Sequence, residues 1–172
     1  MSKSVSARSA VRVTATARTA AKAEPTDKAH VQAVANFDLL AQLPHLLRRA
    51  HFEAEAKFSS IFGDEFTSRQ LALLVSISSS PGVSQAEIAQ QIGLDPNTCS
   101  DLVARTLAKK LIRRERSEVD GRVYRLFLTT AGIGVVRAAV PRTDEYRDAV
   151  ARNLKPAETE KLVKLLRKLM DF

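Results

Sequence analysis

The chain has 172 residues, which suits one domain with an appended tail. Its formal net charge of +8 favours a polyanionic partner such as nucleic acid, and 45% hydrophobic residues suffice for a buried core. No stretch approaches the roughly 20 consecutive apolar residues of a membrane helix, and a single cysteine excludes an intrachain disulfide, which fits a reducing compartment.

Residues 1–30 differ in composition from the rest of the chain. After Met1 they contain no aromatic residue, Leu, Ile or Met, and they carry six Lys or Arg against Glu24 and Asp27. Such a segment buries too little apolar surface to offset its ordering entropy, so we expect a disordered basic tail. A tail that adds loose phosphate contacts and a tail without a role are the main alternatives. The Arg-rich, acid-poor composition also resembles an organelle transit peptide.

Two helices are predicted before residue 82. The domain begins at residue 31, and apolar residues recur at helical spacing over 37–58, where Pro44 should kink the helix or start a new turn. A capping box at 67–70 opens the second helix, which the Ser-Pro-Gly turn at 80–82 ends.

A short helix, a tight turn and a longer helix come next. A capping box at 84–87 opens the short helix and Gly93 closes it. Asp95 caps the longer helix, Pro96 occupies its first position, and the helix runs to about residue 110. Its predicted inner side carries Cys99, Leu102, Val103, Thr106 and Leu107.

Two strands are predicted at 112–116 and 123–128, joined by a polar hairpin at 117–122. Positions 105–125, which include the first strand and the start of the second, hold eight Lys or Arg and three acids, so the hairpin is a basic finger suited to a DNA backbone or minor groove.

The C-terminal part is predicted to be helical. Thr129 or Thr130 should cap a long helix through residue 150, bent at Pro141, and Pro156 should start a last helix. An apolar stripe on that last helix consists of Leu162, Leu165, Leu166 and Leu169.

This element order is typical of a winged helix-turn-helix, in which the second helix enters the major groove of DNA. Arg105 can pair with guanine and Asn97 with adenine, and the free amides at the helix start suit phosphate. The alternative is a solvated helix face, against which the basic hairpin argues. The candidate DNA-binding residues are Ser84, Gln85, Pro96, Asn97, Thr98, Ser100, Asp101, Arg105, Arg114, Asp120 and Arg122.

Five short motifs then point to one family. They are Ser-Gln-Ala-Glu-Ile-Ala at 84–89, Val-Ala-Arg at 103–105, Leu-Ile-Arg-Arg at 111–114, Asp-Gly-Arg at 120–122 and Leu-Thr-Thr-Ala-Gly at 128–132. With them, residues 33–172 resemble a regulator of the MarR (multiple-antibiotic-resistance regulator) family. Two positions depart from its pattern: Lys110 stands where Gly is usual, and Asp101 where a basic or neutral residue is common. Asp101 either pairs with Arg105 one turn on or accepts a hydrogen bond from a cytosine amine.

The resemblance implies a mainly α (α+β) fold, a winged helix-turn-helix with a flanking helical dimerisation region. It implies a DNA-binding lobe at 67–130 and a homodimer formed through 33–62 and 131–172. We expect a bacterial, cytoplasmic and nucleoid-associated regulator that has no membrane partner and binds no cofactor or metal. Its expected role is that of a repressor released from a pseudo-palindromic double-stranded operator by a small effector.

The segment at 44–52 resembles the branch of the family that senses aromatic acids or their coenzyme A thioesters. Aromatic side chains can hold a ring, and Arg or His can hold a carboxylate or phosphate. A Phe stripe at helical spacing is equally a feature of plain core, and that alternative stays open. The candidate ligand residues are His45, Arg48, Arg49, His51, Phe52 and Phe58.

Three other functions are weaker alternatives. Cys99 near a helix N-terminus would favour a thiolate and a redox-responsive regulator, against which a packing role is the simpler interpretation. A nucleoid-type winged-helix protein without a small ligand also fits the composition. An enzyme does not, because the three histidines form no zinc-ligand cluster and no catalytic motif is present.

Overall fold

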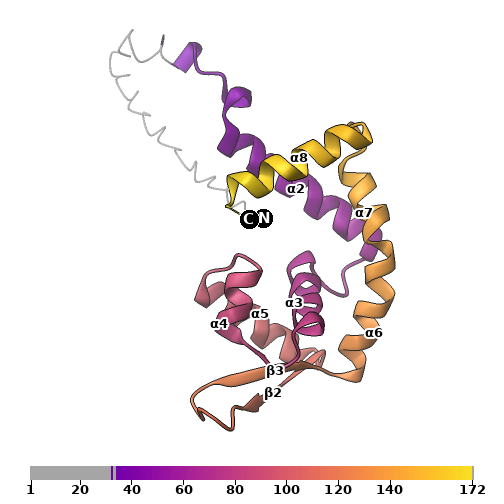
Figure 1. The fold of residues 1–172 in the computed structure, drawn as a ribbon. Helices are drawn as coiled ribbons and strands as arrows, with labels where there is room; N and C mark the ends of the chain where they lie inside the picture. Colours follow the sequence, from indigo (N-terminus) through magenta and orange to yellow (C-terminus); the bar gives the residue numbers. More distant parts are fainter. Residues whose placement is uncertain (1–31, 33, 172) are drawn as a thin grey trace, which may run out of the picture. The chain divides into compact units, whose positions relative to one another are not determined.

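The computed structural model describes residue 32 and residues 34–171 (Figure 1). The predicted disordered tail at 1–30 lies outside the described residues. The chain divides into two units, Met1–Ala41 and Gln42–Phe172. In the first unit, the 3₁₀ turn η1 spans Leu39–Ala41.

The second unit begins with the helices α2 (Leu43–Phe62) and α3 (Ser68–Ser79). Pro44 lies in the first turn of α2, where its missing N–H removes no intrahelical hydrogen bond, so it marks a start rather than a kink. The predicted capping box opens α3: the Thr67 hydroxyl accepts the Gln70 N–H, and the Gln70 side chain accepts the Thr67 N–H.

The helix-turn-helix pair is α4 (Gln85–Gln91) and α5 (Pro96–Ala108). The capping box of Ser84 and Glu87 opens α4, and the Asp95 carboxylate accepts the N–H groups of the first turn of α5. Gly93 has φ of +68°, a left-handed conformation that allows the chain to reverse between the two helices. Both predicted helix starts are confirmed.

Lys110 follows the second helix of this pair, the recognition helix α5. It adopts the left-handed conformation, with φ of +56°. Its N–H donates to the Leu107 carbonyl at 2.8 Å, and the Leu111 N–H donates to the Thr106 carbonyl at 3.2 Å. These two bonds form a Schellman motif, in which the residue in the left-handed conformation is usually glycine. The departure from the family pattern at this position therefore changes the residue but keeps the turn.

The wing is a three-stranded antiparallel sheet in the order β1 (Val83–Ser84), β3 (Tyr124–Leu128), β2 (Ile112–Arg116). The hairpin register pairs Ile112 with Leu128 and Arg116 with Tyr124. β2 matches its predicted range, β3 begins one residue later than predicted, and β1, which is only two residues long, was not predicted.

The helical stretch predicted from Thr129 to residue 150 is present, but it is interrupted at Pro141, where only a bend was expected. The chain forms α6 (Thr130–Ala139), the 3₁₀ turn η2 (Val140–Arg142) and α7 (Thr143–Val150). Pro141 breaks the helix because its ring and missing N–H prevent an α-helical bond to the preceding turn. The last helix, α8, spans Pro156–Leu169 as predicted.

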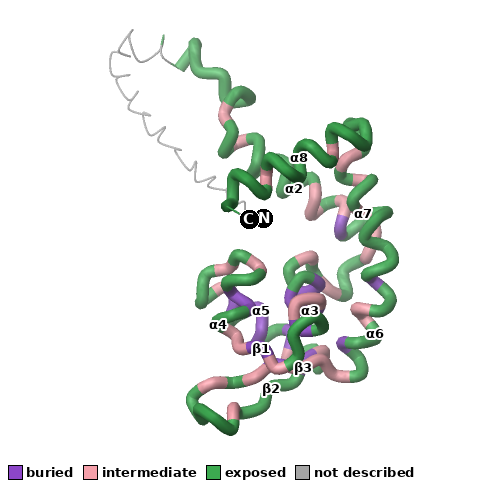
Figure 2. The backbone as a smooth tube through the Cα atoms, in the orientation of Figure 1, coloured by how far each residue is buried: buried purple, intermediate pink, exposed green. Residues whose placement is uncertain are grey.

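Buried residues gather in two clusters (Figure 2). The larger cluster joins α3, α4, α5 and the sheet around Leu73, Leu74, Ile88 and Leu126, each at most 1% exposed. The smaller cluster packs Phe58 of α2 against residues of α3, α6 and α7. The larger core therefore fixes the helix-turn-helix and the wing as one lobe. No helix in the described part of the chain is both long and apolar enough to cross a membrane.

Candidate nucleic-acid interface

The recognition helix α5 has one buried and one exposed side. Cys99, Leu102, Val103 and Thr106 are buried, whereas Asn97 and Arg105 are exposed. Ser100, Asp101 and Ala104 are also exposed. The exposed side chains are small or carry hydrogen-bonding groups, which suits close approach to base edges.

Two predicted contacts on this face take a different form. The Thr98 hydroxyl donates to the Asp95 carboxylate at the helix cap, so its donor is already used. Arg105 Nε donates to the backbone carbonyl of Asp101 at 3.3 Å, which corrects the expected pairing with the Asp101 carboxylate. That contact aligns the Arg105 side chain along the helix and leaves the exposed Asp101 carboxylate free to meet a base or a water molecule.

The basic strand β2 holds its arginines over aromatic rings. The Arg113 guanidinium lies 4.6 Å from the centre of the Phe127 ring, and that of Arg114 lies 4.7 Å from the Tyr124 ring. A hydrogen bond with Arg116 lowers the pKa of the Tyr124 hydroxyl. Cation–π contacts of this kind restrict the arginine side chains and keep their charge on the wing.

The tip of the wing is braced by its own side chains. The Asp120 carboxylate accepts the N–H of Arg122 at 3.0 Å, and the Ser117 hydroxyl accepts the N–H groups of Val119 and Asp120. Asp120 therefore fixes the backbone that carries Arg122. Val119 at the same tip is 97% exposed, an apolar group that sequence analysis did not single out.

The Arg125 side chain makes contacts within the protein. Its Nη1 donates to the Gly82 carbonyl at 3.3 Å and lies 3.7 Å from the Glu87 carboxylate. A hydrogen bond from the Ser84 backbone is the main cause that lowers the pKa of Glu87. Arg125 thus ties β3 to the start of α4. Strand alternation could have predicted this orientation of Arg125, because Tyr124 and Leu126 lie on the other side of β3.

A concavity of about 450 Å³ lies where α4, α5 and the wing meet. Four predicted DNA-binding residues from three separate segments line it, namely Ser84, Gln85, Pro96 and Arg122. Cys99 also lines it but is fully buried, and its thiol faces the Gln85 carbonyl at 3.6 Å. Burial raises the pKa of Cys99, so the expectation of a stabilised thiolate is wrong.

The predicted ligand residues do not form one pocket. Phe58 is 3% exposed inside the aromatic cluster of Phe58, Phe62, Phe66 and Tyr146, whereas Phe52 is 62% exposed. Six positions along α2 separate the two rings, which places them on different faces of the helix. Phe58 is therefore part of the core and not of a site that Phe52 shares, and a ligand role for the other five residues stays a prediction.

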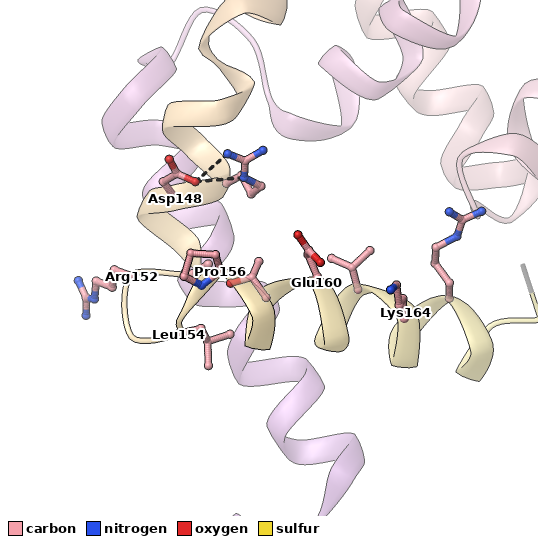
Figure 3. A pocket seen from close by; sticks show the side chains of 11 residues that line it. Asp148, Arg152, Leu154, Pro156, Glu160 and Lys164 are labelled. Carbon is pink, nitrogen blue, oxygen red and sulfur yellow. Dashed lines mark hydrogen bonds and ion pairs between the residues drawn. The ribbon is translucent and has the colours of Figure 1, made fainter.

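The cationic members of the predicted ligand set lie on the surface of α2. Arg48 is exposed, with Nη2 2.9 Å from His45 Nδ1, and Arg49 and His51 are exposed as well. A larger groove of about 750 Å³ runs along α7 and α8 (Figure 3). None of the six predicted ligand residues lines it, and in the described residues no cluster of His, Cys, Asp or Glu could hold a metal ion.

Comparison with known proteins decides the family. A profile described as the MarR family matches residues 65–123, which contain α3, the helix-turn-helix and β2 and end just before β3. The HTH-type transcriptional regulator BilQ of Clostridium symbiosum is 31% identical over 127 residues, which are 66% of this chain and 88% of BilQ. The chain belongs to the MarR family.

Two further MarR-type comparisons agree with this assignment. The HTH-type transcriptional repressor NicR of Pseudomonas putida is 28% identical over 136 residues, 78% of this chain and 86% of NicR. The structure of BpsR of Bordetella bronchiseptica, whose DNA binding is regulated by 6-hydroxynicotinic acid, superposes with a TM-score of 0.74 at 27% identity, covering 79% of this chain and 98% of BpsR. This MarR-family member is a DNA-binding transcriptional regulator and not an enzyme, and its predicted winged-helix fold is confirmed.

Proposed function

We propose that this protein is a repressor that binds a pseudo-palindromic operator as a homodimer and is released by a small aromatic acid or its coenzyme A thioester. The observation that carries the DNA-binding part is the concavity between α4, α5 and the wing. Residues predicted independently from sequence converge there, with Arg122 on one wall and the first turn of α5 on another. A DNA backbone seated in it would place the exposed side of α5 in the major groove.

In this proposal the exposed side of α5 reads the bases, and the wing binds phosphate. Asn97 and Arg105 present amide and guanidinium groups that match adenine and guanine edges. Arg122 is exposed on a braced tip and, in the described part of the chain, makes no ion pair with an acidic side chain. It is therefore available to a phosphate or to a narrow minor groove.

The apolar surface of α8 supports the homodimer. None of its fourteen residues is buried, and Leu162, Leu165 and Leu169 are 44–55% exposed along one stripe. Leu43 and Leu46 of α2 are exposed in the same way. Contiguous exposed leucines mark an association surface, and a second copy offers an equally apolar stripe. Two-fold symmetry in the protein would make a pseudo-palindromic operator the matching site.

The effector part rests on relatives and on α2. The DNA binding of BpsR is regulated by 6-hydroxynicotinic acid, an aromatic acid, and NicR is a repressor. In this chain Arg48, held by His45, and Phe52 share an exposed side of α2, where a carboxylate and a ring could be held together. An effector that prefers a form with wrongly spaced recognition helices lowers the affinity for DNA by its differential binding.

Titration of a protein–operator complex tests the proposal. An operator is first selected from random duplex DNA, and 6-hydroxynicotinate, benzoate-type and cinnamate-type acids and their thioesters are then added while fluorescence anisotropy reports bound DNA. Release by at least one compound, reduced more than tenfold in potency in Arg48→Ala, is the expected result. Tight operator binding that no compound disturbs would leave a regulator without this class of ligand, and equal affinity for random DNA would indicate a nucleoid-type protein.

A further inference from the structure

Gln70 is a polar side chain buried between α3 and the recognition helix. It is 4% exposed, and its side-chain nitrogen donates to the Thr106 hydroxyl of α5 at 3.3 Å. Thr106 is fully buried and donates onward to the Leu102 carbonyl at 2.7 Å. A buried amide is costly unless it is fully hydrogen-bonded. Here it links α3 to the C-terminal turn of α5.

Lys109 makes a second link from the end of α5 to the same segment. Its Nζ donates to the backbone carbonyl of Glu65 and lies 3.4 Å from Gln70 Oε1. The Thr67 N–H donates to that same oxygen at 3.2 Å. Because two donors meet the oxygen, the amide nitrogen is directed to Thr106, and the carboxamide can occupy only one orientation.

The other side of segment 65–70 is held by α2. The Phe66 ring centre lies 5.9 Å from that of Phe58 and 6.0 Å from that of Phe62. The Ser68 hydroxyl donates to the Glu55 carboxylate. The segment is therefore fixed to α2 by ring packing and one hydrogen bond, and to α5 by Gln70 and Lys109.

We propose that Gln70 is a positioning residue that sets the orientation of the recognition helix and thereby the discrimination between operator and other DNA. Bidentate base contacts depend on the angle of the helix, whereas phosphate contacts made by the wing tolerate small displacements of α5. Loss of the Gln70–Thr106 hydrogen bond weakens operator binding and leaves binding to random DNA unchanged. The inference rests on the proposed base-reading role of α5.

The test compares Gln70→Leu, Thr106→Val and their double variant, with Thr106→Ser as the control that keeps the hydroxyl. Affinities for the selected operator and for a random duplex are measured at a temperature where circular dichroism shows each variant fully folded. We expect an operator-to-random affinity ratio lowered about tenfold in the variants, the scale of one lost buried hydrogen bond, and unchanged in Thr106→Ser. The double variant should be no worse than the more affected single variant, since Gln70→Leu already removes the hydrogen bond that Thr106→Val removes.

If Gln70→Leu does not fold, Lys109→Met, a substitution at an exposed position, tests the positioning role in its place. An unchanged ratio in the folded variants overturns the inference, as does a loss that affects both DNAs equally. Asn97→Ala distinguishes a failure of the positioning role from a failure of base reading by α5. If it lowers the ratio while the Gln70 and Lys109 variants do not, only the positioning role fails; if it leaves the ratio unchanged, base reading by α5 fails and the inference fails with it.

Discussion

Lys110→Gly should make the protein more stable, although it removes a side chain. A non-glycine residue in the left-handed region costs roughly 1–2 kcal/mol, and Lys110 adopts this conformation with φ of +56°. Glycine pays roughly 0.5–1 kcal/mol more entropy on folding. Both Schellman hydrogen bonds use backbone atoms and survive the change. The net gain is about 0.5–1 kcal/mol, or roughly 1–4 °C in Tm for a chain of this size.

Urea denaturation followed by circular dichroism measures this gain at a fixed protomer concentration, since association would otherwise shift the midpoint. Ala108→Gly, two residues earlier at the last residue of α5, is the matched control and should lose stability, by up to about 0.5–1 kcal/mol. The reasoning is refuted if Lys110→Gly is no more stable than the unmodified protein while Ala108→Gly loses stability as expected.

Three further predictions concern the wing, the packing of α6 and the dimer. Arg122→Ala should weaken binding to all DNA sequences and flatten the dependence of affinity on salt by about one unit of slope. An unchanged slope would show that Arg122 does not contact the DNA backbone. Gly132→Ala should be severely destabilised, because an added Cβ would lie 2.0 Å from the Leu111 carbonyl oxygen, whereas Gly134→Ala, with nothing within 4 Å, should fold normally in a thermal melt. Leu165→Glu should yield monomers in light scattering and Leu165→Met should not; an intact Leu165→Glu dimer would exclude α8 from the interface.

Local hydrogen-bonding signals predicted much of the fold. The starts of α3, α4 and α5 follow from side chains that cap helices within three residues, so their geometry is contained in the sequence. The ranges of β2 and β3 follow from alternation bounded by a polar turn. The family pattern, in turn, identified Lys110 as a departure, and the structure explains it as a left-handed residue in place of glycine.

Long-range packing was harder to predict. The arginines of positions 105–125 look alike in sequence, yet Arg125 faces Gly82 and Glu87 while Arg122 faces solvent. The burial of Gln70 depends on Thr106, thirty-six residues away. Phe52 and Phe58 were assigned to one site because they are near in sequence, but ring packing with Tyr146 draws only Phe58 inward. Composition does not specify which partner a side chain meets across the core.

The central claim is that α5 and the wing recognise a particular DNA sequence. The most direct measurement selects a duplex from a random pool with the full chain and then compares its affinity with that of a scrambled duplex of equal length across a salt series. The selected duplex should bind at least about 10³-fold more tightly at physiological salt, contain two inverted half-sites, and lose this advantage in Asn97→Ala and Arg105→Ala. Equal affinity for the selected and scrambled duplexes, at every salt concentration, would contradict the central claim.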